Sequence, residues 1–285
     1  MEVKVVAPSR LRGVGRALGA PWRALDDVGR QASFYGEAIG WVPKAVKSYK
    51  REQVRLIAEV GMSDGALAVI GGSSIITLFI TFFAGLNGGV QVYYGLSNLN
   101  LEAFAGFSGA IICPRLLTPI IAGTALAATV GTGFTAQLGA MRISEEIDAL
   151  EVMSVRSLPY LVSTRVAAGM ITIIPIYAMA LVGGWIAWKL ALVQFFGLAA
   201  GTYDHYFDTF MHPTDIIYAM IQAVGIAIVV ILIHTYYGYT ASEGPVGVGE
   251  AVGKAVRASF VAVMTICLLI ATALYGSADT LRISG

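Results

Sequence analysis

Long stretches without charged residues alternate with short charged segments along this chain of 285 residues. Residues 65–101 carry no charge, and residues 103–141 carry only Arg115. Three further uncharged runs follow, at 166–188, 216–242 and 258–278. A helix that crosses a bilayer needs about 20 mostly apolar residues, so each run is long enough to form one. The pattern predicts five membrane-spanning helices, at about 64–85, 107–134, 163–189, 215–237 and 257–277.

The composition agrees with a membrane protein and excludes several other classes. Apolar residues make up 56% of the chain and charged residues 13%, about half the charge of a typical soluble domain. Disordered chains are rich in charge, and a net charge of +1 does not suit a nucleic-acid binder. A transmembrane β-barrel would show short alternating strands instead of long neutral runs. We therefore expect an all-α integral membrane protein with a transmembrane domain over residues 61–285.

The orientation follows from the Lys and Arg residues in the segments between the spans. If the N-terminus is cytoplasmic, the inside segments carry 16 basic residues and the outside segments carry only Arg282. Basic residues accumulate in cytoplasmic segments. We therefore expect a multi-pass protein of the inner (plasma) membrane with its N-terminus in the cytoplasm and its C-terminus outside.

The N-terminal region contains most of the basic residues. Residues 1–43 are expected to form a basic cytoplasmic segment, loosely ordered over residues 1–30. Residues 44–60 place apolar and basic side chains on opposite faces at helical spacing, and Pro43 suits the first turn of a helix. Such a helix fits the inner leaflet, with its cations at lipid headgroups. A solvated cytosolic helix is the alternative.

A short acidic segment lies in the expected cytoplasmic loop between spans two and three. We expect a helix at about 142–153, with Ser144 as N-cap and with Ile143, Ile147 and Leu150 on one face. Its apolar face and its carboxylates suit docking into a groove on a cytosolic protein. A solvated surface turn is the alternative. Catalysis by the carboxylates is disfavoured because acid–base chemistry needs a water-excluded cleft.

The acidic segment reads GAMRISEEIDALEVM over residues 139–153 and resembles the signature loop of the MlaE/YrbE permeases, the membrane subunits of lipid-moving ABC transporters. The resemblance extends over about residues 44–277. The other matching positions are Arg115 with Pro119, Pro159-Tyr160-Leu161 with Arg165, and Gly244–Val252. It implies an MlaE-type permease fold in which the acidic helix is a coupling helix that docks on an ATPase. The implied contact residues are Arg142, Glu145, Glu146, Asp148, Leu150 and Glu151.

Three positions depart from the family pattern, because neutral residues replace charged ones in or beside span two. They are Leu116, Thr129 and Gln137. The departures suggest one half of a permease heterodimer, and the chain looks most like the B-type YrbE subunits of mycobacterial Mce lipid transporters. That likeness implies import of a fatty acid, mycolic acid or sterol lipid. The implied partners are a paralogous YrbE-type permease, two ATPase copies and an Mce-type extracytoplasmic lipid-binding assembly.

The chain shows no sequence pattern for ATP hydrolysis. The stretch from Gly247 to Ala255 approaches a phosphate-binding loop, but its spacing is wrong and no Ser or Thr follows Lys254. We therefore expect no enzyme activity, cofactor or metal in this chain, and we expect ATP-Mg in a partner ATPase.

Arg115 is the one charged residue expected within a span. Such residues are costly and usually face a protein interior or water, so a functional or packing role is favoured over snorkelling. Two other function classes stay open: a membrane scaffold that anchors Mce proteins without translocation, and an ion-coupled secondary transporter. The latter would need membrane-embedded carboxylates, and we expect no deeply buried Asp or Glu in any span.

Overall fold

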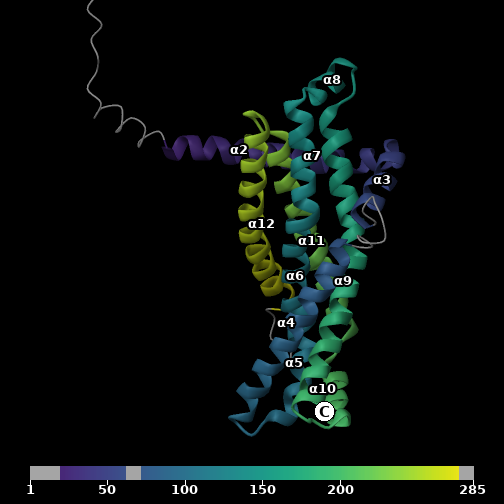
Figure 1. The fold of residues 1–285 in the computed structure, drawn as a ribbon, viewed down its shortest axis with the longest axis vertical. Coiled ribbons are helices and arrows are strands. Elements are labelled where there is room, and N and C mark those ends of the chain that lie inside the picture. The colour runs from purple at the N-terminus through teal and green to yellow at the C-terminus, as the bar shows by residue number, and fades with distance from the viewer. Residues whose placement is uncertain (1–19, 62–71, 276–285) are drawn as a thin grey trace, which may run out of the picture.

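The computed structural model describes residues 20–61 and 72–275, and within these ranges the chain is helical and contains no strand. Five helical segments are long and apolar enough to cross a membrane, and they run side by side along the long axis of the molecule (Figure 1). They cover Ser74–Ser97, Glu102–Ile143, Leu158–Phe195, Pro213–Tyr239 and Gly244–Tyr275. The predicted all-α fold with five spans is confirmed.

The α-helices are labelled as in Figure 1. They are α2 (Ala20–Ser48), α3 (Lys50–Gly61), α4 (Gly72–Ser97), α5 (Ala105–Ile112), α6 (Thr118–Leu126), α7 (Thr132–Ile143), α8 (Glu146–Val152), α9 (Thr164–Leu190), α10 (Ala200–Phe210), α11 (Pro213–Tyr239) and α12 (Gly244–Tyr275). A 3₁₀ turn at Glu102–Phe104 precedes α5.

Spans two and three are each built from α-helix joined to wider π-helical turns. Span two contains such turns at Cys113–Leu117 and Ala127–Gly131. Span three begins with one at Leu158–Ser163 and ends with one at Ala191–Phe195. Proline lacks an N–H, so Pro114 and Pro159 interrupt the regular hydrogen-bond ladder where two of these turns occur.

The centre of the bundle differs from its edges. Spans two, three and four are half or more buried, whereas α4 and α12 leave most of their surface uncovered. α4 packs on α9, and α12 packs on α11 and α7. The outward faces of α4 and α12 carry exposed apolar side chains such as Phe83 and Val261. This distribution suits contact with lipid or with another apolar subunit.

Small residues allow α4 and α9 to approach each other closely. A Cβ added at Gly85 would lie 2.8 Å from the carbonyl oxygen of Gly184. A Cβ added at Gly184 would lie 2.8 Å from the Sγ of Cys113. Glycine is therefore required at this crossing, as is common where membrane helices pack backbone to backbone.

The boundaries of the first span differ from the prediction of 64–85. α4 ends twelve residues later, at Ser97, while residues 62–71 lie outside the described part. The uncharged run is longer than one span, so composition alone could not choose the window. Packing determines where α4 ends, because Tyr93 near that end stacks on Phe196 with ring centroids 4.0 Å apart.

The end of the third span also differs from the prediction of 163–189. Helical structure continues through Ala191–Phe195, and the separate helix α10 then begins at Ala200. Span three is therefore longer than predicted. Its neutral sequence continues beyond the 20 or so residues that length arguments assign to a span.

The N-terminal region is more regular than predicted. Residues 1–19 lie outside the described part, but α2 begins at Ala20 and continues past Pro43, which lies inside it and not in a first turn. The expected helix at 44–60 is divided between the end of α2 and α3. α2 crosses the spans at a large angle near one end of the bundle (Figure 1).

Packing against the bundle explains why α2 is ordered so far upstream. The ring of Phe34 meets that of Tyr236 edge-on at 5.3 Å, and Ser163 Oγ donates to the carbonyl oxygen of Ala38 at 2.8 Å. Burial raises the pKa of Tyr35 to about 12. These contacts come from spans three and four, so periodicity within residues 1–43 could not reveal them.

Candidate functional site

The acidic segment forms a projection at the end of the bundle where α2 lies (Figure 1). α7 ends at Ile143, and Glu145 has a φ of 60° in the left-handed region. Such a φ is uncommon for a residue other than glycine. The chain turns there and continues as α8, from Glu146 to Val152.

The predicted start of this helix is wrong. The expected range was about 142–153, but residues up to Ile143 belong to α7. Ser144 does not cap α8. Its Oγ donates to the carbonyl oxygen of Ala140 at 2.9 Å and to Glu146 Oε1 at 3.1 Å. The Ser144 hydroxyl therefore bonds to the last turn of α7, whereas the sequence pattern predicted that it would cap α8.

The predicted apolar face of the helix is divided. Ile147 is buried against Leu138 and Leu161, and Leu150 packs against the same cluster. Ile143 is exposed on α7. The apolar side chains that face outward at the tip are Val152, 86% exposed, and Met153, 64% exposed. Ile147 and Leu150 therefore hold α8 on its own protein, whereas Val152 and Met153 are available to a partner.

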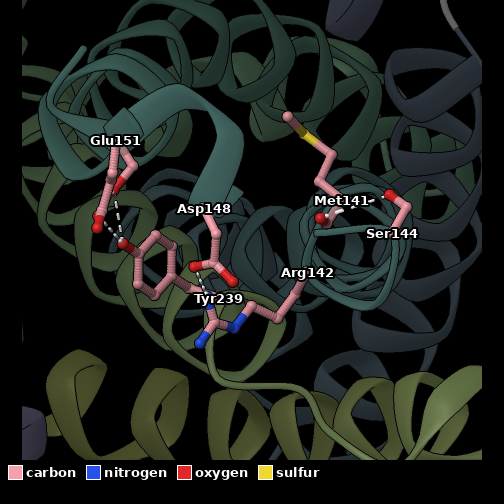
Figure 2. A network of polar contacts seen from close by, with 7 residues as sticks. Met141, Arg142, Ser144, Asp148, Glu151 and Tyr239 are labelled. Carbon is pink, nitrogen blue, oxygen red and sulfur yellow. Dashed lines mark hydrogen bonds and ion pairs between the residues drawn. The ribbon is translucent and has the colours of Figure 1, made fainter. Parts of the chain in front are cut away.

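Polar contacts join α8 to neighbouring elements, and Figure 2 shows those of Asp148 with Arg142 and of Glu151 with Tyr239. Arg142 Nη1 lies 2.7 Å from Asp148 Oδ1 and joins the end of α7 to α8. Ser157 Oγ donates to Glu151 Oε1 at 2.6 Å and lies 2.7 Å from the Tyr239 hydroxyl. The Tyr239 hydroxyl also donates to Glu151 at 3.5 Å. Glu151 therefore links α8 by hydrogen bonds to Ser157, at the base of the loop, and to Tyr239, at the end of α11.

The six residues that the sequence placed in one contact set fall into two groups. Arg142, Asp148, Glu151 and Leu150 contact other parts of the same chain. Glu145 and Glu146 lie exposed on the turn and the first residue of α8, where Glu146 accepts a hydrogen bond from the neighbouring Ser144. Sequence reasoning missed Val152 and Met153 as outward apolar groups, although both lie in the segment it singled out.

A cavity of about 450 Å³ lies between α2 and the base of this loop. Glu37 of α2 and Glu151 line it, together with Arg156. The Arg156 guanidinium lies 4.9 Å from the centre of the Trp41 ring on α2, within cation–π distance. α2 is therefore in contact with the base of the acidic loop through Trp41 and Arg156.

The other singled-out cation, Arg115, lies in span two within the first π-helical turn. Its Nη2 forms an ion pair of 2.8 Å with Asp215 Oδ2 in the first turn of α11. Its guanidinium also lies 4.5 Å from the centre of the Tyr275 ring at the end of α12. The expectation that no span contains a buried carboxylate is therefore wrong, because Asp215 is 4% exposed. The position of Asp215 at the boundary of a neutral run concealed its burial.

The neutral replacements in span two also have definite surroundings. Gln137 Oε1 accepts a hydrogen bond from the buried Arg165 at 3.2 Å. Thr129 Oγ1 donates to the carbonyl oxygen of Ala125 at 2.8 Å. Leu116 is half-exposed on the bundle surface. Gln137 therefore lies beside a buried cation that a carboxylate could pair with.

Comparison with known proteins places this architecture in a family. The family model described as "Permease MlaE" matches residues 62–273. A probable ABC transporter permease protein of Rickettsia prowazekii is 30% identical over 205 residues, which are 70% of this chain and 77% of the relative.

Two further relatives have names that describe a role. The intermembrane phospholipid transport system permease protein MlaE of Haemophilus influenzae is 24% identical, over 73% of this chain and 81% of its own length. The chloroplastic protein TRIGALACTOSYLDIACYLGLYCEROL 1 of Arabidopsis thaliana is 26% identical, over 73% of this chain and 59% of its own length. The chain therefore belongs to the MlaE permease family and is a multi-pass inner-membrane permease component of an ABC-type lipid transport system.

Proposed function

We propose that α8 is the coupling helix through which a separate ATPase drives lipid movement by this permease. The main support for this proposal is the division of the side chains on and beside α8 into buried and outward-facing groups. The helix is seated by the buried Ile147 and presents Glu145, Glu146, Val152 and Met153 outward. Apolar anchors beside unpaired charge provide affinity and register in protein interfaces.

The connection from α8 to the spans supports this role. Glu151 contacts Ser157 near the start of span three and Tyr239 at the end of α11. Arg142 connects Asp148 to α7, which continues span two. A partner that displaced α8 would therefore move the ends of three spans. The partner supplies ATP-Mg, because this chain has no phosphate-binding loop of the required spacing.

The finer assignments are also proposals. The N-terminus lies in the cytoplasm, where the 16 basic residues of the inside segments favour it, and the C-terminus lies outside. Two permease chains assemble with two ATPase copies, and the second permease is a paralogue that carries the family charges absent at Leu116, Thr129 and Gln137. The substrate is a fatty acid, mycolic acid or sterol lipid, imported from an Mce-type extracytoplasmic assembly.

The coupling role is tested by reversing the two outward carboxylates with Glu145→Lys/Glu146→Lys. Asp148 and Glu151 are left intact, because their substitution would also remove contacts within this chain. We expect about tenfold or greater weakening of ATPase association, since like charges would replace opposite charges at the interface. Co-purification of the ATPase and lipid uptake are the measurements.

Two controls accompany that variant. Glu145→Gln/Glu146→Gln removes the charge without reversing it and should give an intermediate loss. Asp208→Lys changes an exposed carboxylate on α10, at the opposite end of the bundle, and should leave association unchanged (Figure 1). If the reversed variant retains both the ATPase and full uptake, the coupling role is wrong.

The partners and the alternative scaffold role have their own test. Mass spectrometry of the complex purified from its native membrane should identify a second permease, an ATPase and Mce-type proteins. A scaffold predicts that lipid uptake survives loss of this chain once the other proteins are assembled by artificial linkage. Loss of uptake under those conditions supports a translocating permease.

A further inference from the structure

α2 ends at Ser48 and α3 begins at Lys50, which leaves a one-residue break at Tyr49. Hydrogen bonds from the Tyr49 N–H to Ala45 and from the Gln53 N–H to Tyr49 continue the helical pattern across this break. A cavity of about 470 Å³ opens at this break. Its lining residues are Ser48, Tyr49, Arg51, Glu52, Arg55 and Tyr160. Ser48 ends α2, Tyr49 lies at the break, and the next three belong to α3. Tyr160 comes from the π-helical turn that begins span three.

The charge of this cavity is positive. It contains two guanidinium groups and one carboxylate. Arg55 Nη1 lies 3.6 Å from Glu52 Oε2, which is a long contact between an exposed guanidinium and a partly buried carboxylate. Arg51 is exposed and forms no ion pair within residues 20–61 and 72–275.

The walls of the cavity also provide neutral donors. Tyr49 and Tyr160 meet edge to face, with ring centroids 5.2 Å apart, and both line the cavity. Their hydroxyl groups and that of Ser48 can donate hydrogen bonds. Arginine favours phosphate because its planar guanidinium donates two parallel hydrogen bonds. The combination suits a phosphate ester that has an apolar or glycerol part beside the rings.

We propose that this cavity binds the phosphate of an anionic membrane lipid. The proposal rests on the proposed orientation in one respect: this end of the bundle must lie at the inner leaflet. α2 crosses the spans near one end of the bundle, and α3 packs on α4 and α9 (Figure 1). In the proposed orientation this end of the bundle meets the headgroup layer of the inner leaflet. A bound headgroup there converts diffuse attraction by basic residues into recognition at one place.

The position of Tyr160 gives the site a connection to α8. Tyr160 packs against the cluster of Leu138, Ile147 and Leu161 that seats α8. A lipid bound beside Tyr160 would therefore contact the same wall that supports the coupling helix. The binding site is nevertheless built from α2, α3 and span three, so its test does not depend on ATPase docking.

The experiment compares lipid retention by the purified permease, together with any subunits that co-purify. Detergent-solubilised protein is exposed to phosphatidylglycerol or phosphatidylcholine, and retained lipid is counted by native mass spectrometry. The site variant is Arg51→Gln/Arg55→Gln. The matched control is Lys44→Gln/Lys47→Gln, which removes the same charge from exposed positions of α2 outside the cavity.

The wild-type protein should retain phosphatidylglycerol in preference to phosphatidylcholine. The site variant should bind it about tenfold more weakly, because two charge-assisted contacts are lost, and the control should bind as wild type. Equal loss in both variants would overturn the proposal in favour of diffuse charge, as would no loss in the site variant. Displacement of the lipid by millimolar inorganic phosphate would show a site for free anions and would also overturn it.

Discussion

Among residues 20–61 and 72–275, two Arg–Asp ion pairs of nearly equal length lie in very different surroundings. Arg142 and Asp148 approach to 2.7 Å at the projecting α8, with side chains 39% and 59% exposed. Arg115 and Asp215 approach to 2.8 Å between spans, with side chains 14% and 6% exposed. The first pair joins neighbouring segments, whereas the second joins helices 100 residues apart in sequence.

The comparison shows that the distance between the charged atoms does not by itself determine how much an ion pair contributes to stability. Water solvates the exposed pair whether or not it is formed, so breaking the pair costs little. The buried pair has already lost its water, so removing one partner leaves the other charge uncompensated. The exposed pair therefore suits a surface that binds and releases a partner protein. The buried pair suits a permanent contact between spans two and four.

The largest expected effect follows from Asp215→Asn. Removing the carboxylate leaves Arg115 buried without its counter-charge, and we expect a loss of about 3 kcal/mol or more in unfolding free energy. The measurement is the denaturant midpoint of the purified protein in one detergent, followed by tryptophan fluorescence. Asp204→Asn is the control, because Asp204 forms an exposed pair with Lys189. Equal midpoints for the two variants would contradict the distinction between buried and exposed pairs.

A local effect is expected from Ile147→Ala. The side chain is fully buried, and its truncation should cost about 2–4 kcal/mol through lost packing and the cavity left behind. Because α8 has few other apolar contacts with the bundle, the loss should appear as faster amide hydrogen exchange over residues 146–152. Val152→Ala provides the comparison, since that side chain is exposed. It should weaken ATPase association while exchange in α8 stays at the wild-type rate.

The smallest effect is expected from Asp148→Asn. We expect less than about 1 kcal/mol of destabilisation, because exposed ion pairs contribute little. The cost should shrink further as salt is raised, since screening weakens exposed pairs first. Unfolding midpoints measured at low and high salt provide the test. A cost that matched Asp215→Asn, or that did not respond to salt, would show that the α7–α8 junction is less hydrated than its exposure indicates.

The sequence predicted the number and type of the spans because long neutral runs have few stable alternatives in a bilayer. It also located the acidic segment, whose charges stand out between two apolar runs. It misplaced the end of span one, because nothing in residues 65–101 marks which 20 or so residues cross the membrane. It failed to predict the helix upstream of residue 44, whose order depends on contacts with Tyr236 and Ser163.

Within the site, the sequence identified the right segment but not the roles of its side chains. Ile143, Ile147 and Leu150 were predicted on one face because they fit one helix, yet Glu145 breaks that helix in two. Asp148 and Glu151 were grouped with Glu145 and Glu146 because all are carboxylates. Only their partners, Arg142, Ser157 and Tyr239, separate the residues that hold α8 from those that face outward.

The sequence by itself thus determined an all-helical membrane protein of five spans with an acidic segment between spans two and three. The length of an apolar run and the charges beside it are properties of short stretches of sequence, and they decide directly whether a helix crosses the bilayer and in which direction. The tertiary structure alone decided that Asp215 meets Arg115, that Tyr160 faces the break between α2 and α3, and which groups of α8 remain exposed. Those outcomes depend on contacts between residues distant in sequence, for which no local pattern carries a signal.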